Sequence, residues 1–117
     1  MAWNHRVCNG VEILEMPIFL RGDEALDRFC QTISALMDSG KYQIILDFHR
    51  LTLINSAGIA HLLRAVQDAR QRGGDIKVIR LKPAVRDLFH YTGIHTKIDI
   101  LSDENDAKKR FQGITCQ

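Results

Sequence analysis

The sequence predicts an α/β fold: a small mixed, largely parallel β-sheet of four to five strands with about four helices packed on it. Short β-branched apolar runs alternate along the chain with segments of helical periodicity, and glycines and prolines stand between them. Strands that alternate with helices favour a parallel sheet joined by right-handed crossovers. The 117 residues can bury one two-layer core but not a second, so we expect a single domain over residues 1–117.

The first elements follow from a change of period near residue 23. Residues 11–20 are strand-like but contain Pro17, which cannot donate to a ladder, so two short strands are expected to meet there. From Asp23 the apolar residues fall at helical spacing, and Gly40 can end that helix in a left-handed conformation. The apolar face of this first helix comprises Leu26, Phe29, Cys30, Ile33, Leu36 and Met37.

The central strand is predicted at residues 43–48, a short β-branched apolar run typical of a strand covered on both faces. A loop over residues 49–54 leads to a second helix, which begins near Ser56 and is stopped by Gly73 and Gly74. The apolar face of the second helix comprises Ile59, Leu62, Leu63 and Val66.

The last third of the chain repeats the strand and helix pattern. Residues 76–81 and 98–101 are predicted strands, and Pro83 suits the first turn of a helix between them that Gly93 ends. Ser102 or Asp103 can cap a final helix whose early acids and late bases match the helix dipole. These charged residues are Glu104, Asp106, Lys108, Lys109 and Arg110.

Composition places the chain among ordinary globular proteins, with 45% hydrophobic and 26% charged residues. The sequence has neither an apolar signal region nor a stretch near the roughly 20 apolar residues that span a bilayer, so no membrane insertion and a cytoplasmic location are expected. Cys8, Cys30 and Cys116 have no metal-ligand or paired spacing. We therefore expect reduced thiols, no disulfide framework and no zinc site.

Basic residues outnumber acidic ones between residues 64 and 87, although the net charge of the chain is only +2. Two interpretations remain open for this segment: a solvated basic face, or a docking surface for an acidic protein partner. Nucleic acid is not an expected partner, because aromatic residues make up only 7% and do not interleave with the bases. The basic residues are Arg64, Arg70, Arg72, Lys77, Arg80, Lys82 and Arg86.

The sequence does not predict an enzyme. Ser56 lacks the G-x-S-x-G elbow, no phosphate-binding glycine motif occurs, and no cofactor or metal is expected. Of the scattered histidines only His49 lies near the Ser56 loop, and no paired carboxylates flank it. The histidines are His5, His49, His61, His90 and His95.

The segment after Asp47 carries the functional signal, because a short apolar loop delivers Asn55, Ser56, Ala57 and Gly58 to the start of a helix. Asn55 and Ser56 are both good helix caps, which is one interpretation of the segment. The other is that the unpaired N–H groups of the first helical turn could hold a phosphate on Ser56. The small residues Ala57 and Gly58 would then leave room for a kinase or a partner backbone.

This segment resembles the signature of the STAS domain, in which an apolar strand ends in Asp and an eight-residue step leads to Asp-Ser-x-Gly and an apolar helix. Asp47, Ser56 and Gly58 keep that spacing. The resemblance continues through Gly73-Gly74, the strand at 76–81, Pro83-Ala-Val and Tyr91-Thr-Gly-Ile, and so covers about residues 11–111.

The resemblance implies an anti-sigma-factor antagonist. Such a protein binds an anti-sigma factor that is also a serine kinase, releases it when the conserved serine is phosphorylated, and is reset by a phosphatase. Carried over to this chain, Ser56 is the phosphoacceptor, and the partner-binding residues are Asp23, His49, Asn55, Ser56, Ala57 and Gly58. Assembly as a homodimer is also compatible with this reading.

One residue departs from the family pattern, since Asn55 stands where the family usually has Asp. Asn keeps the capping ability and removes the negative charge beside the serine. Members of the fold also serve as non-phosphorylated subunits of lipid-transport or signalling scaffold complexes, and this alternative stays open beside the kinase switch.

Overall fold

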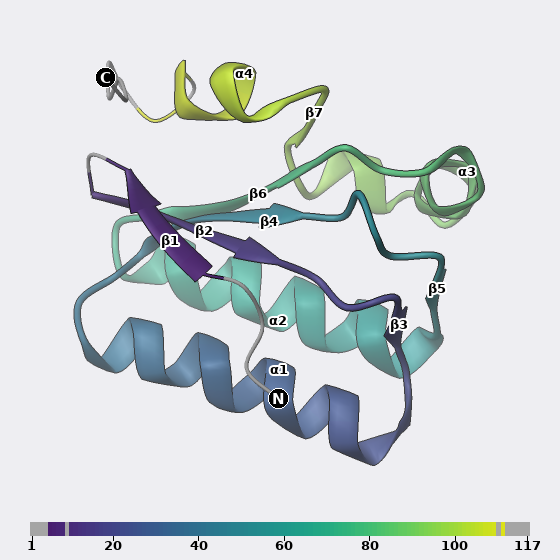
Figure 1. Cartoon of the computed structure of the whole chain (residues 1–117), viewed down its shortest axis with the longest axis horizontal. Helices are drawn as coiled ribbons and strands as arrows, with labels where there is room; N and C mark the ends of the chain where they lie inside the picture. Colours follow the sequence, from purple (N-terminus) through teal and green to yellow (C-terminus); the bar gives the residue numbers. More distant parts are fainter. Residues whose placement is uncertain (1–4, 9, 110, 112–117) are drawn as a thin grey trace.

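A computed structural model of the chain describes residues 5–8, 10–109 and 111, and its centre is a five-stranded sheet in the order β1-β2-β4-β6-β7 (Figure 1). Only β1 runs antiparallel to its neighbour β2, and the other three pairs are parallel. The predicted mixed, largely parallel α/β fold is thereby confirmed. β4 is the middle strand, as its uninterrupted apolar run indicated.

The strands are β1 (His5–Cys8), β2 (Val11–Glu15), β3 (Phe19–Leu20), β4 (Gln43–Asp47), β5 (Leu53–Ile54), β6 (Asp75–Ile79) and β7 (Ile100–Leu101). The helices are α1 (Gly22–Asp38), α2 (Ser56–Gln71), α3 (Pro83–Tyr91), the short 3₁₀ helix η1 (Ile94–Thr96) and α4 (Glu104–Lys109). Each predicted helix is present. Pro83 occupies the first turn of α3, and Gly40 and Gly93 adopt left-handed φ values of 81° and 78°.

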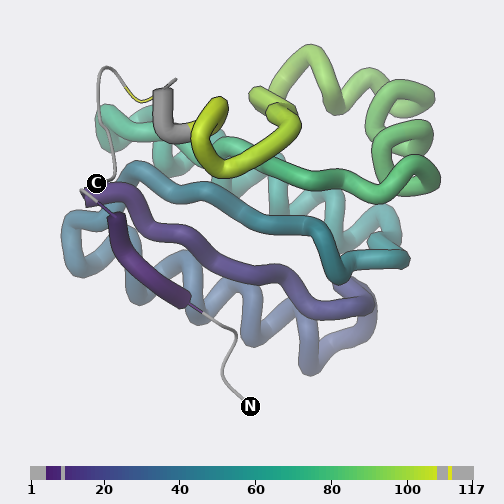
Figure 2. The backbone as a smooth tube through the Cα atoms, turned by 45° about the horizontal axis from the view of Figure 1, so that its top comes forward, coloured from purple at the N-terminus to yellow at the C-terminus, as the bar shows by residue number. Residues whose placement is uncertain are grey.

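Two apolar layers flank the sheet. Helices α1 and α2 cover one face, with α3 at its end, and the side chains between them and the sheet form the larger core (Figure 1). α4 lies on the opposite face, next to β6 and β7 (Figure 2). The smaller core on that face comprises Cys8, Val11, Ile13, Ile45, Ile79, Ala107 and Phe111.

Two of the strands, β1 and β5, are not predicted by the sequence pattern. β1 was not predicted because its residues are mostly exposed and its partner is a hairpin neighbour rather than a buried layer. The imidazole of His5 joins it to the buried Glu12 on β2, with 2.6 Å between Nε2 and Oε1. β5 lies inside the segment that was expected to be a loop, and it forms a separate two-stranded parallel ribbon with β3.

The last helix, α4, was expected to begin after Ser102 or Asp103 and to end in basic residues. Asp103 rather than Ser102 caps α4, because its Oδ1 accepts the Asp106 N–H at 2.9 Å. Arg110, expected near the end of that helix, lies outside the described residues.

The two described cysteines differ in state. Cys30 is a free thiol, whereas Cys8 is disulfide-bonded, which corrects the expectation of a reduced thiol at Cys8. Within the described part of the chain, none of the helices combines the length and apolar character needed to cross a bilayer.

Candidate functional site

The β3–β5 ribbon brings the starts of α1 and α2 to one end of the molecule (Figure 1). The Thr52 N–H and hydroxyl both donate to the carbonyl of Ile18, at 2.8 and 3.1 Å. The Asn55 N–H reaches the carbonyl of Leu20 at 3.5 Å. These bonds fix the loop before α2 against the segment before α1, so residues around 20 and 56 become neighbours in space.

Gly58 sets the distance between α2 and the ribbon. A Cβ atom at this position would lie 2.7 Å from the Leu20 carbonyl oxygen and 2.9 Å from Cγ1 of Ile54, closer than side chains normally pack. Gly58 itself is buried. The small size of this residue predicts room for a partner, but in the structure that room is filled by the Leu20 backbone and the Ile54 side chain.

Asn55, and not Ser56, is the cap of α2. Its side-chain Oδ1 accepts the Gly58 N–H at 2.8 Å, the geometry of an N-cap residue bonding to the third residue of the helix. Ser56 is the first residue of the helix and is exposed. Its hydroxyl makes no hydrogen bond to any residue that the structure describes. Of the two capping candidates, the structure therefore selects Asn55 and leaves the Ser56 hydroxyl free.

The first turn of α2 keeps donors that no described residue satisfies. Gly58 and Ile59 donate to the side chain and carbonyl of Asn55, but the N–H groups of Ser56 and Ala57 have no acceptor within residues 5–8, 10–109 and 111. The first turn contains no acidic residue. The end of the helix dipole next to Ser56 is thus electropositive and open to solvent.

A cluster of exposed apolar side chains stands beside Ser56. Ile18, Phe19 and Leu53, which we call the apolar strip, are 44%, 49% and 39% exposed and lie on the β3–β5 ribbon or directly before it. Phe19 and Leu53 are paired across the ribbon, and the Arg21 guanidinium lies 5.2 Å from the centre of the Phe19 ring. Large apolar side chains that are gathered at one exposed place make a candidate interaction surface.

The apolar strip was missed from the sequence because Ile18 and Phe19 were assigned to a strand and Leu53 to a loop. Their exposure depends on which side of the ribbon faces the sheet, and Leu20 and Ile54 take the buried positions. A longer strand would reveal its exposed side by alternating polar and apolar residues. Strands of two residues, such as β3 and β5, are too short to show such an alternation.

The other predicted partner-binding residues divide between two places. Asp23 is exposed in the first turn of α1, at the same end as Ser56. His49 is drawn to the face of the sheet that α4 partly covers, because its Nδ1 lies 3.0 Å from Oδ1 of Asp47 and its Nε2 lies 3.8 Å from Glu15. The structure thus places Asp23 at the end of the molecule that carries Ser56, and it pairs the His49 ring with Asp47 and Glu15.

Asp47 acts as a structural anchor at the ends of two strands. Only 1% of it is exposed, and it accepts hydrogen bonds from the His49 N–H at 3.0 Å and from Arg80 Nε at 3.2 Å, while a second Arg80 nitrogen contacts its other oxygen. Burial raises the pKa of the Asp47 carboxyl, but the hydrogen bonds from Arg80 and His49 lower it more, so the pKa lies below its ordinary 3.8. Arg80 reaches Asp47 from a left-handed backbone, φ 58°.

Four of the seven basic residues between residues 64 and 87 form ion pairs within the fold. Arg70 and Lys77 form ion pairs with Asp75, Arg72 pairs with Asp68, and Arg80 pairs with Asp47. These four positive charges are therefore balanced by carboxylates of the same chain. Lys77 is buried, and it also lies 2.8 Å from Asp99. Arg64, Lys82 and Arg86 have no carboxylate partner among the described residues.

The sequence and the fold match those of known proteins. The family model for the Mlab, STAS domain matches residues 21–102. A protein of Bordetella bronchiseptica assigned as the anti-sigma factor antagonist BtrV is 30% identical over 80 residues, which cover 68% of this chain and 69% of that protein. The chain therefore belongs to the STAS domain family and is related to its anti-sigma factor antagonists.

Solved structures repeat the architecture at lower identity. A protein of Thermotoga maritima assigned as an anti-sigma factor antagonist superposes with a TM-score of 0.85 at 16% identity, over 94% of each chain. The Bacillus anti-sigma factor antagonist SpoIIAA superposes with TM-scores of 0.74 in its unphosphorylated form and 0.68 in its phosphorylated form. These two structures share 20% and 19% identity with this chain, cover 97% and 93% of it, and are covered to 100% and 98%. At such identity the likeness establishes the fold.

Proposed function

We propose that this protein is a phosphorylation-controlled anti-sigma factor antagonist, and that the apolar strip with Ser56 at its border is the surface that binds the anti-sigma factor. The observation that carries the proposal is the free, exposed Ser56 hydroxyl next to Ile18, Phe19 and Leu53. Asp23, Asn55 and Ala57 complete the same surface. Gly58 contributes by positioning the helix.

In the unmodified state the surface is suited to an apolar partner. Burying the exposed parts of three large side chains supplies a favourable association energy of about 25 cal/mol for each Å² removed from water. Ser56 is neutral and makes no internal hydrogen bond that binding would have to break. The partner in this proposal is an anti-sigma factor that is also a serine kinase, consistent with the relatives' assignment as anti-sigma factor antagonists.

Phosphorylation would reverse this preference. A phosphate on Ser56 adds about −1.5 to −2 charges at the border of the apolar strip, and these charges must be desolvated when the partner docks. The free N–H groups of Ser56 and Ala57 and the positive end of the α2 dipole can hold the phosphate in the free protein. The modified state is thus stabilised when unbound and penalised when bound, and a phosphatase resets it.

The binding surface is tested by titrating the purified full chain with the kinase-type anti-sigma factor of the same cell, using calorimetry. We expect Phe19→Ser to weaken binding tenfold or more, because an aromatic anchor at an interface is commonly a hot spot. Val7→Ser is the matched control: Val7 is 54% exposed, but it lies on β1 at the edge of the main sheet. Equal affinities for the Phe19→Ser and Val7→Ser variants would contradict the assigned surface.

The switch is tested with the same partner and ATP. Mass spectrometry should find one phosphate on the peptide that contains Ser56, and Ser56→Asp should weaken the complex, whereas Ser56→Ala should bind like the wild type and accept no phosphate. A complex that is indifferent to ATP, formed equally well by Ser56→Asp, would instead support the alternative of a constitutive subunit in a lipid-transport or signalling scaffold complex. Asn55, which replaces the usual acid, is the feature that keeps this alternative in the test.

A further inference from the structure

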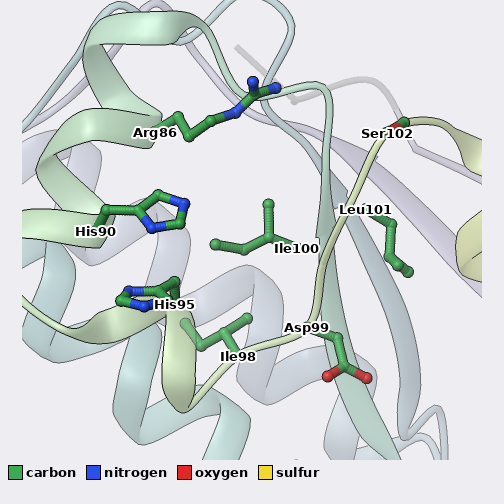
Figure 3. A pocket seen from close by; sticks show the side chains of 8 residues that line it. All are labelled: Arg86, His90, His95, Ile98, Asp99, Ile100, Leu101 and Ser102. Carbon is green, nitrogen blue, oxygen red and sulfur yellow. The ribbon is translucent and has the colours of Figure 1, made fainter.

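A groove separates α3 and η1 from β7, the last strand of the main sheet (Figure 3). Its volume is about 450 Å³, and its walls include Arg86 and His90 from α3, His95 from η1, and residues 98–102. None of these elements carries Ser56 or the apolar strip. The groove is therefore a second surface, separate from the proposed anti-sigma factor site.

One wall of the groove is the unpaired edge of the sheet. The Val78 N–H donates to the Asp99 carbonyl at 3.0 Å, and the Arg80 N–H donates to the Leu101 carbonyl at 3.3 Å. Since backbone groups alternate in direction along a strand, the N–H and C=O of Ile100 point away from β6. No described strand pairs with β7 on that side. An open edge of this kind is a template for an added strand.

The opposite wall is cationic. Arg86 is exposed and has no carboxylate partner among the described residues, and His90 points into the groove beside it (Figure 3). The His95 ring stacks on the His90 ring with 4.2 Å between centroids, which keeps the His90 imidazole in place. The Asp99 carboxylate points away from the groove, and it binds Lys77 at 2.8 Å (Figure 3).

The groove also has an apolar base. Ile98 is buried and Ile100 is half-buried, and both side chains project toward α3 (Figure 3). Residues of an added strand would alternate between the two sides of the sheet, so every second side chain would face Arg86 and His90. Backbone donors and acceptors along one wall, an apolar base and a cation on the other wall together fit a peptide better than a small free anion.

We propose that this groove binds an extended acidic segment of a partner protein. The segment adds as a strand along β7, exchanges backbone hydrogen bonds with Ile100, and places carboxylates at alternate positions against Arg86 and His90. Charge complementarity selects the acidic sequence, because an Arg guanidinium forms charge-assisted hydrogen bonds with carboxylates. Arg64, Lys82 and Arg86 are the basic residues between residues 64 and 87 that have no described carboxylate partner, and of these three Arg86 lines the groove.

The test uses the full chain and a capped eight-residue peptide in which Glu alternates with Thr, with a Gln-for-Glu peptide as the control probe. Two-dimensional amide NMR should show the largest shifts at Ile100 and Ser102 with the Glu peptide and weaker ones with the Gln peptide. Fluorescence anisotropy should show at least fivefold weaker binding for Arg86→Gln. Arg64→Gln is the matched control, since Arg64 is exposed on α2 and likewise has no described carboxylate partner.

A second variant separates the edge from the charge. Ile100→Pro removes the N–H that faces the groove without removing a donor to β6, and it should abolish the Ser102 shift while the rest of the spectrum stays folded. The proposal is overturned if the peptide binds Arg86→Gln as tightly as the wild type. It is also overturned if the shifts map to the apolar strip, or if the β7 amides shift with protein concentration alone, which would show that a second copy of the chain occupies the edge.

Discussion

The two neighbouring residues at the start of α2 have different roles in the folded protein. Asn55 and Ser56 are both capping residues by type, but the backbone geometry aims the Asn55 Oδ1 at the Gly58 N–H and turns the Ser56 hydroxyl to solvent. The cap stabilises the helix, while the free hydroxyl is available for modification. The replacement of the usual acid by Asn55 thus preserves the fold at this position.

This division of tasks predicts different costs for removing each side chain. Asn55→Ala should lower the free energy of unfolding by about 1 kcal/mol, because an N-cap hydrogen bond is lost. Ser56→Ala should change it by less than about 0.5 kcal/mol, as expected for an exposed residue without partners. Urea unfolding of both variants measures the difference, with Asn55→Asp as a control that retains a capping oxygen. A Ser56→Ala variant as unstable as Asn55→Ala would show that the serine is the cap.

Among the strands, the ends of β4 and β6 are held in place by hydrogen bonds between polar side chains and the segments that follow. Asp47 is buried at the end of β4, and it binds both the turn at His49 and the Arg80 side chain that follows β6. The strand ends are therefore locked together at the point where the chain leaves the sheet. Asp47 belongs to the STAS signature in the sequence. The physical reason for an Asp at this position is that its carboxylate accepts hydrogen bonds from the segments that follow β4 and β6.

The Asp47 cluster predicts a pH dependence of stability. The pKa of Asp47 in the folded protein lies below its ordinary value of 3.8, so the cluster stabilises the fold above that pH and loses its contribution as the pH falls through the folded pKa. Asp47→Asn should cost about 1–2 kcal/mol at pH 7, a value reduced by the partial exposure of Arg80. The gap between the wild type and the variant should narrow below about pH 4.

Urea unfolding at a series of pH values measures this gap. Asp87→Asn serves as the control, since Asp87 is exposed on α3 and its side chain makes no described hydrogen bond. A gap that stays constant from pH 7 down to pH 3 would mean that the carboxylate charge of Asp47 does not contribute to folding.

At the scale of the whole molecule, a rigid sheet carries two less protected surfaces at its margins. β4 has neighbours on both sides, and Ile44, Ile45 and Leu46 are fully buried. The β3–β5 ribbon has two residues in each strand and an exposed apolar side, and β7 is a two-residue strand at the sheet edge. Both proposed binding surfaces are thus built on short, peripheral strands and held in place by the central ones.

This arrangement predicts the order of amide hydrogen exchange. The amides of β4 should exchange only by global unfolding, whereas those of the β3–β5 ribbon should exchange through local opening at lower free energy. Exchange of the full chain followed by NMR or mass spectrometry measures both. If the ribbon amides are as protected from exchange as those of β4, the prediction that the ribbon opens locally is wrong.

The fold could be predicted largely from local pattern. A helical stripe such as Leu26, Phe29 and Ile33, or an apolar run such as residues 43–48, records the burial of its own element, and turn residues such as Gly40 and Gly93 record its end. The candidate site was located for a similar reason, because capping residues after a buried strand define a helix start. β1 and β5 were missed because short, half-exposed strands exist only through pairing with distant residues.

The α/β fold, the start of α2 and the choice of Ser56 as the candidate phosphorylation site all follow from the sequence alone. The three-dimensional arrangement is needed to show that Asn55 is the cap and that Gly58 packs against the ribbon. It is also needed to show that the side chains of the apolar strip are exposed near Ser56. The structure also shows which cations form ion pairs and which, like Arg86, have no carboxylate partner among the described residues. The physical reason is that periodicity encodes which side of an element is buried, whereas hydrogen bonds, close approaches and ion pairs depend on where separate elements meet.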